Sequence, residues 1–287
     1  MSYIVTNYKN IDSINLLCDG LIINSMEYSC FPENKYSKEN ILDIINIIKK
    51  NDKLTILNCD KIIHEYELGD FKEYINNYID FVDYLIYSDK CVLKMVDSKY
   101  YEKLVYDSKT LVCSYNELNN IETKSFVSSE LSYDELSEIV YKVDNNKLCI
   151  NAFGYHQIMY SRRPLISLYN KHLGEELLSK NTIYDLKEEL RDDFYKITEN
   201  DQGTFIYTPF IYALLENVSI IKNKVFMFRI NSFLLTYSDV EFICNCYNEL
   251  LKGKNEEVIK NIEDHFSNVK PGFLKDELYL LKQKNNK

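Results

Sequence analysis

The chain has 287 residues, of which 46% are apolar, and this is enough for one large domain or two modest ones. The formal net charge of −10 disfavours a broad nucleic-acid-binding surface, because such surfaces are usually basic, but it is compatible with a local basic pocket. No apolar run is long enough to span a bilayer, and the N-terminus lacks the basic start and apolar core of a signal peptide. We therefore expect a cytoplasmic protein without a membrane partner.

Short apolar strands alternate with amphipathic helices along the chain. Helices are expected at residues 14–17, 38–50 and 71–82, and after the capping box formed by Ser132 and Glu135. The expected strands cover residues 3–6, 21–25, 54–58, 84–87, 103–106, 124–128, 148–153 and 225–230. This alternation predicts an α/β protein, either a TIM-like (β/α)8 barrel, regular or distorted, or an open doubly wound sheet. No GxGxxG follows the first strand, which disfavours a Rossmann dinucleotide site.

Residues 165–209 interrupt this alternation with a charged segment, after which Gly203 begins another expected strand. We expect an inserted hairpin or small lobe before the last barrel strand, over the face where barrel enzymes place their active sites. A lid without a chemical role is the alternative. After the last strand, Ser238 and Glu241 are expected to form a capping box for the next helix.

The expected domain organisation is a barrel domain at residues 1–252, including the insertion, and a short helical C-terminal tail at residues 253–287. Helices in the tail are expected at residues 256–266 and 274–281.

The eight cysteines are scattered and form no CxxC pair. Most lie among apolar residues, so we expect buried thiols and no disulfides. On the helix after residue 236, Cys244 is expected on the apolar side and Cys246 away from it. No zinc or iron–sulfur spacing is visible, so no metal site is predicted.

The segment at residues 148–169 combines a strand, a glycine and polar side chains. Gly154 at the strand end permits a tight turn or a close approach of another backbone. A loop is expected to follow, with an adjacent arginine pair whose guanidinium groups could bind a phosphate or carboxylate. The alternative is an ordinary strand exit with solvated arginines. The polar residues of the loop are Tyr155, His156, Tyr160, Ser161, Arg162 and Arg163.

This segment resembles the signature Glu-x-Phe-x-His-Gly-Ala-x-Cys-x-x-Tyr-Ser-Gly-x-Cys of the collagenase-like proteins of peptidase family U32. Gly154, Tyr160 and Ser161 are in register with it. The two signature cysteines are replaced by Gln157 and Pro164.

The resemblance extends over roughly residues 20–250. Asn58 and His64 match an Asn-x-x-x-x-x-His segment that follows the third strand in this family, and Glu130 lies in a match to a Ser-Arg-Glu-Leu-Ser segment. The family fold is a TIM-like barrel, which agrees with the strand count. The resemblance therefore implies a site at the barrel mouth, with substrate-binding candidates at Asn58, Glu130, Gly154, Tyr160, Ser161, Arg162 and Arg163.

Of the four histidines, His156 is the better candidate for a catalytic acid or base, because the usual pKa of histidine suits proton transfer and an arginine pair is close in sequence. His64 is the second candidate, because it follows a barrel strand, although a structural loop histidine is the simpler interpretation. No HExxH or GxSxG motif is present.

The resemblance implies two classes of function. The family was named for proteolysis of collagen-like substrates, whereas other branches act in hydroxylation of transfer RNA, ribosomal RNA or ubiquinone, several with an iron–sulfur cluster on cysteines. The missing signature cysteines argue against a cluster here. We expect a scaffold or enzyme of RNA modification, with RNA as partner. The alternatives are a peptidase for collagen-like or unfolded peptides, and a catalytically degenerate barrel that binds a ligand or a protein partner.

Overall fold

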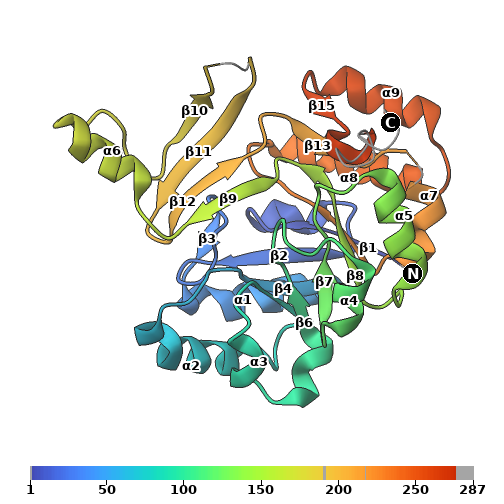
Figure 1. Ribbon diagram of the computed structural model, residues 1–287. Helices are drawn as coiled ribbons and strands as arrows, with labels where there is room; N and C mark the ends of the chain where they lie inside the picture. The colour runs from blue at the N-terminus through green and yellow to red at the C-terminus, as the bar shows by residue number, and fades with distance from the viewer. Residues whose placement is uncertain (1, 190–191, 217, 276–287) are drawn as a thin grey trace, which may run out of the picture.

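The computed structural model describes residues 2–189, 192–216 and 218–275. Within these ranges, eight parallel strands close into a barrel, because β14 pairs with both β1 and β8 (Figure 1). This confirms the predicted barrel, and each of its strands overlaps a predicted one. In order around the barrel they are β1 (Tyr3–Asn7), β2 (Gly20–Ser25), β4 (Leu54–Cys59), β5 (Tyr84–Tyr87), β6 (Leu104–Tyr106), β7 (Lys124–Phe126), β8 (Leu148–Gly154) and β14 (Met227–Ile230).

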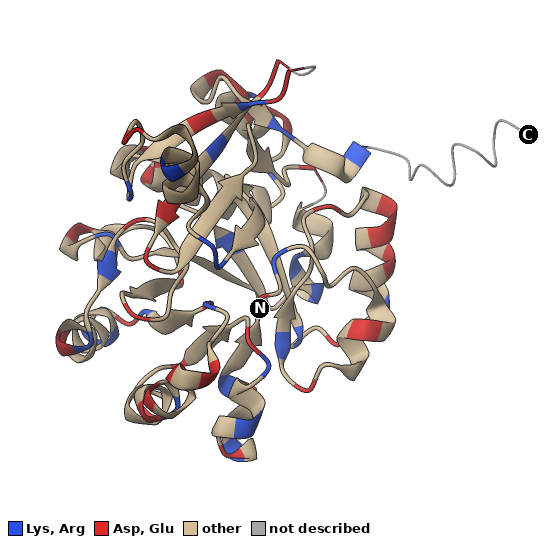
Figure 2. Cartoon of the chain, turned by 60° about the vertical axis from the view of Figure 1, so that its left-hand side comes forward, with Lys and Arg blue, Asp and Glu red and all other residues tan. Residues whose placement is uncertain are grey.

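Helices surround the strands, as Figure 2 shows. The ring is irregular, because the segment after β1 contains only a 3-10 helix at Ile11–Asn15 and the helix after β5 is a single turn. The helices that connect barrel strands are α1 (Lys38–Lys50), α2 (Leu68–Tyr78), α3 (Val92–Met95), α4 (Tyr115–Asn120), α5 (Tyr133–Lys142) and α7 (Val218–Ile221), and α8 (Tyr237–Leu251) follows β14. Helix α5 begins at the predicted capping box of Ser132 and Glu135.

A layer of apolar side chains fills the lower part of the barrel interior. Each barrel strand contributes one residue to this layer: Val5, Ile22, Ile56, Ile86, Val105, Phe126, Cys149 and Met227. A second, larger apolar cluster packs the outer faces of the strands against the helices. Since side chains alternate between the two faces of a strand, both faces of this parallel sheet are buried, as expected for a barrel core.

The inserted segment forms a second sheet over the C-terminal ends of the barrel strands (Figure 1). In the part of the chain that is described, this antiparallel sheet has the order β10 (Ile183–Lys187), β11 (Phe194–Asn200), β12 (Gly203–Tyr207) and β9 (Gln157–Ser161), and α6 (Leu165–Leu173) packs beside it. The prediction of a loop at residues 155–163 is therefore wrong, because Gln157–Ser161 pairs with β12. Strand β9 pairs with β12, which is more than 40 residues away in the sequence, so no local sequence pattern indicates that β9 is a strand.

The remaining elements lie after the insertion, except for the short strand β3 (Lys35–Tyr36), which pairs with β2. Strand β13 (Ile211–Ala213) pairs with β8 and with β15 (Val269–Lys270). Helix α9 (Glu256–His265) confirms the first predicted tail helix. The second, at 274–281, lies mostly outside the described residues. None of the described helices combines the length and hydropathy needed to cross a membrane.

Two predictions about helix α8 are wrong. Its capping box is formed by Thr236 and Asp239, two residues before the predicted box, because the helix begins at Tyr237. Cys246 is buried in the core together with Cys244, since the helix packs over a wider face than its apolar stripe indicated.

Candidate functional site

The barrel interior changes from apolar to polar toward the C-terminal ends of its strands. Two residues after each member of the apolar layer the side chain is polar: Asn7, Asn24, Asn58, Ser88, Asp107, Ser128, Asn151 and Arg229. A spacing of two keeps these side chains on the face of the strand that points inward. The mouth of the barrel is therefore built as a polar chamber above an apolar floor.

Asp107 is the centre of a buried ionic network in this chamber. The side chain is fully buried, and its Oδ2 accepts hydrogen bonds from Lys109 Nζ at 2.8 Å and from Arg229 at 2.8 Å. Burial alone would raise the pKa of Asp107, but Arg229 and Lys109 outweigh this effect and lower the pKa well below its usual range. Asp107 is therefore ionised at every physiological pH.

The network continues on both sides of Asp107. Lys109 Nζ also contacts Asp60 Oδ2 at 2.6 Å, and Arg229 Nε donates to Asn151 Oδ1 at 2.7 Å. The Arg229 guanidinium lies 4.1 Å from the centroid of the Phe126 ring, so the apolar floor supports it. The two cations and two buried carboxylates balance each other in charge.

Lys109 has a backbone φ of 66°, in the left-handed region that non-glycine residues rarely adopt. Its backbone N–H donates to Asp107 Oδ1 at 3.1 Å, and its side chain turns back to the same carboxylate. Such strained residues concentrate at functional sites. The strained turn places a cation between two carboxylates at the chamber wall.

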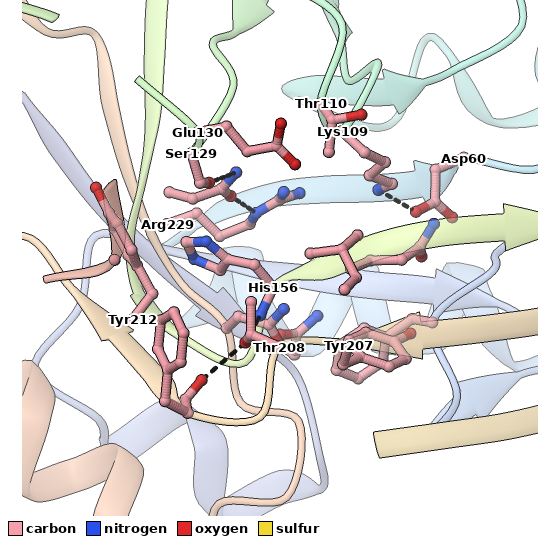
Figure 3. A pocket seen from close by; sticks show the side chains of 18 of the residues that line it. Asp60, Lys109, Thr110, Ser129, Glu130, His156, Tyr207, Thr208, Tyr212 and Arg229 are labelled. Atoms are coloured by element: carbon pink, nitrogen blue, oxygen red, sulfur yellow. Dashed lines mark hydrogen bonds and ion pairs between the residues drawn. The ribbon is translucent and has the colours of Figure 1, made fainter. Parts of the chain in front are cut away.

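A cavity of about 60 Å³ opens above this network, with room for a few water molecules or a small chemical group (Figure 3). Glu130, Arg229 and Lys109 border it on one side, and residues of the inserted segment border it on the other. Its apolar and aromatic walls are Ile22, Phe31, Ile158, Tyr207, Phe210, Tyr212 and Phe273. The cavity thus combines aromatic walls with a few polar groups, which is typical of small-ligand sites.

His156 is the most unusual polar group in this cavity. Its side chain is buried, and no hydrogen-bond partner for Nδ1 or Nε2 lies among the described residues. The ring packs against Tyr212, with centroids 4.4 Å apart, and lies between Tyr212 and Arg229 in Figure 3. Burial lowers the pKa of His156 to about 3, and the positive charge of Arg229 adds to the shift. The imidazole is therefore neutral and offers one donor and one acceptor to a ligand.

The His156 main chain is fixed by Thr208. Its N–H donates to the Thr208 hydroxyl at 3.1 Å, and its carbonyl accepts from the Thr208 N–H at 2.8 Å. Because both backbone groups are bound, the unpartnered ring is held in place by the surrounding structure and is not a loosely placed surface group.

The depressed pKa of His156 predicts a loss of stability in mild acid. The unfolded chain binds a proton near pH 6.5 and the folded chain only near pH 3, so stability is lost progressively as the pH falls through this window. The maximum slope is about 1.4 kcal/mol per pH unit. Urea unfolding of the wild type and of His156→Phe, which keeps the ring packing, should give stability curves that converge or cross as the pH falls. Parallel curves below pH 6.5 would contradict the assignment.

Three of the predicted site residues line the cavity: Asn58, Glu130 and His156. Asn58 is buried, and its Nδ2 donates to Asn24 and Ser29, each at 3.0 Å, while none of the residues that the structure describes donates to its Oδ1. The exposed Glu130 comes from the loop after β7.

The other predicted site residues lie outside the cavity lining. His64 Nδ1 is 3.2 Å from Arg162 at the exposed edge of the insertion. Ser161 and Arg163 are the sequence neighbours of Arg162, and they also lie outside the cavity lining. Tyr160 stacks on Phe205, with centroids 5.0 Å apart, and donates to the Gln202 carbonyl. Gly154 has a φ of 116° where the chain passes Asn231. Their expected roles in substrate binding stay predictions.

The ionic network of Asp60, Asp107, Lys109 and Arg229 is not among the residues that the sequence predicts for the site. A pattern that could have found it is present, because Arg229 interrupts the apolar strand VFMFRI, and Asp60 and Asp107 directly follow strands. Charged residues at these positions of a barrel point to the mouth.

The thiols do not fit an iron–sulfur cluster. None of the eight cysteines lines the cavity, and six are buried singly or among apolar side chains. Burial raises the pKa of Cys18 and Cys246 to about 11, which keeps them protonated. Among the described residues, no three metal-binding side chains gather in one place.

Comparison with known proteins gives one family. The model described as peptidase family U32 matches residues 26–287. The solved structure of the U32 peptidase Mk0906 is 13% identical, covers 80% of this chain and 92% of its own, and has a TM-score of 0.50, which shows a shared fold. The Bacillus cereus spore cortex-lytic enzyme SleL is 10% identical and covers 85% and 74%, with a TM-score of 0.38. No curated protein matches the chain.

Proposed function

Because the chain belongs to peptidase family U32, we propose that the cavity at its barrel mouth binds a small planar group with a hydrogen-bonding edge, and that this group is an unpaired base of an RNA. The protein would then act in RNA modification, in line with the hydroxylation branches of this family. One observation carries the proposal: a neutral, buried His156, whose two ring nitrogens have no hydrogen-bond partner within the described part of the chain, faces an aromatic-walled cavity.

The cavity chemistry suits a base better than a phosphate. The cations Lys109 and Arg229 are already neutralised by Asp60 and Asp107, so little positive charge remains for an anion. A nucleobase presents donors and acceptors along one edge and an aromatic face for stacking. His156 and the free Oδ1 of Asn58 would bind the edge, and the tyrosines and phenylalanines of the wall would contact the face.

The acidic composition also fits recognition of a single base more closely than recognition of a backbone. With a net charge of −10, long-range attraction of RNA is weak, so affinity would depend on a base inserted into the cavity. Single-stranded or loop regions would be the natural substrates, because their bases are already unpaired.

Binding of short single-stranded RNA, followed by fluorescence anisotropy, tests the proposal. We expect the wild type to bind a uridine-containing strand, and His156→Phe to bind at least about tenfold more weakly, since one lost pair of hydrogen bonds corresponds to about 1.4 kcal/mol. The control variant, His265→Phe, changes a histidine on α9 outside the cavity and should bind like the wild type. Equal affinity of His156→Phe, or no binding by the wild type, would remove the proposal.

The peptidase alternative has less support. A thiol nucleophile would need a cysteine at the cavity, and none is there. This alternative predicts cleavage of gelatin that is lost in His156→Phe. A degenerate barrel, the remaining alternative, predicts ligand binding with recovery of the RNA chemically unchanged.

A further inference from the structure

Helix α6 lies at the outer end of the inserted lobe (Figure 1), and part of its apolar surface is exposed. One side of the helix buries Ile166 and Asn170 against the lobe. On the neighbouring side the exposed fractions are 38% for Leu165, 47% for Leu168, 52% for Tyr169 and 42% for Leu173. The spacing of three, four and eight residues places these side chains on one continuous face. Apolar faces of this kind usually mark contact surfaces.

The lobe holds this helix firmly. Glu199 is fully buried on β11 and accepts hydrogen bonds from the Ser167 backbone N–H at 3.0 Å and from the Ser167 hydroxyl. The Leu165 N–H donates to the Thr204 hydroxyl at 2.9 Å. Two of the free N–H groups of the first helical turn are thereby satisfied from the sheet below. The exposed face is therefore a preformed surface.

The charges at the two ends of α6 are opposite in sign. Arg162 and Arg163 precede the helix, and Glu175 and Glu176 follow it, all of them exposed. Lys171 and His172 in the last turn of α6 suit the helix dipole, whereas the four residues that flank the helix have the reverse order of charge.

The pattern is also symmetric about Tyr169. Arg162 and Arg163 lie seven and six residues before it, Glu176 and Glu175 lie seven and six residues after it, and Leu165 and Leu173 lie four residues away on either side. In a twofold antiparallel contact residue i meets residue j while residue j meets residue i, so opposite charges equally far on either side of the axis make the helix complementary to itself.

We propose that α6 is a self-association surface, which packs antiparallel against α6 of a second copy of this chain about a twofold axis near Tyr169. The arginines of each copy then meet the glutamates of the other, Leu165 meets Leu173, and the two Tyr169 rings meet at the axis. This face has four exposed apolar side chains, whereas stable complexes bury about 20–30 residues on each side, so the dimer should be weak. The inference does not depend on the proposed function.

Two charge-reversed variants test the pairing by sedimentation velocity over a range of concentrations. The first variant combines Arg162→Glu with Arg163→Glu, and the second combines Glu175→Arg with Glu176→Arg. In a dimer of two identical variant chains, like charges meet at both ends of the contact. The dissociation constant of each variant should therefore rise at least about tenfold. An equimolar mixture should recover the wild-type level of dimer, because both ends are then complementary. This recovery also shows that both variants are folded.

The matched control is Glu256→Arg with Glu257→Arg, an exposed pair at the start of α9, which should dimerise like the wild type. Leu168→Ser should weaken the dimer without changing any charge. A wild type that stays monomeric at every concentration overturns the proposal, and so does a mixture that dimerises no better than either variant alone. A monomer would point to a different protein as the occupant of this face.

Discussion

Replacing Asp107 by alanine is expected to lower the free energy of unfolding by about 3–5 kcal/mol, because two buried cations lose their shared partner. Lys109 Nζ and Arg229 both bind the Asp107 carboxylate at 2.8 Å, and that carboxylate is wholly shielded from solvent. Lys109 keeps Asp60, but within the part of the chain that is described the one hydrogen-bond partner left to Arg229 is the neutral Asn151. Urea unfolding, with the midpoint and slope fitted separately, measures the loss.

Two further variants separate the buried network from a general effect of removing an acid. Asp185→Ala removes a half-exposed carboxylate that pairs with Lys196 on the lobe, and it should cost no more than about 1 kcal/mol. Combining Asp107→Ala with Arg229→Met should cost less than the sum of the single changes, because the unpaired cation is then gone. A loss from Asp107→Ala as small as that from Asp185→Ala would show that the ionic network does not stabilise the barrel.

Gly154→Ala is expected to destabilise the fold by about 2–4 kcal/mol through backbone strain and a steric clash. Gly154 has a φ of 116°, which side chains with a Cβ rarely adopt. An added Cβ would overlap the Asn231 carbonyl oxygen and lie 2.9 Å from the Asn231 Cβ. Asn231 cannot easily move away, since its N–H donates to the Phe153 carbonyl at 2.8 Å and its Nδ2 donates to the Tyr155 carbonyl at 2.9 Å.

Gly69→Ala is the matched control and should have the opposite sign. Gly69 lies in the first turn of α2, where an added Cβ meets no atom within 4 Å. Alanine favours helix over glycine by about 0.5–1 kcal/mol, so this variant should be slightly more stable than the wild type. If Gly154→Ala unfolded at the same urea concentration as Gly69→Ala, this result would contradict the close approach of Gly154 to Asn231 at the end of β8.

The sequence alone determined the alternation of strands and helices and the positions of the eight barrel strands, and this pattern fitted a barrel or an open doubly wound sheet. Each strand is a short apolar run, and helices such as α1 and α5 have apolar residues at helical spacing and, for α5, a capping box. These patterns depend on a few neighbouring residues, so they are visible without any tertiary contact. Gly154 at the strand end likewise predicted a tight turn or a close approach of another backbone, and the structure has the close approach, to Asn231.

Only the tertiary structure decided which polar residues form the site. Asp107 and Arg229 are far apart in the sequence, and they meet because β14 closes the barrel between β1 and β8. The register of that closure decides which face of each strand points inward, and a shift of one residue would send these charges outward. The pairing of β9 with β12 and the contact between Arg162 and His64 also depend on the tertiary structure. Pairing between strands that are far apart in the sequence has no local sequence pattern.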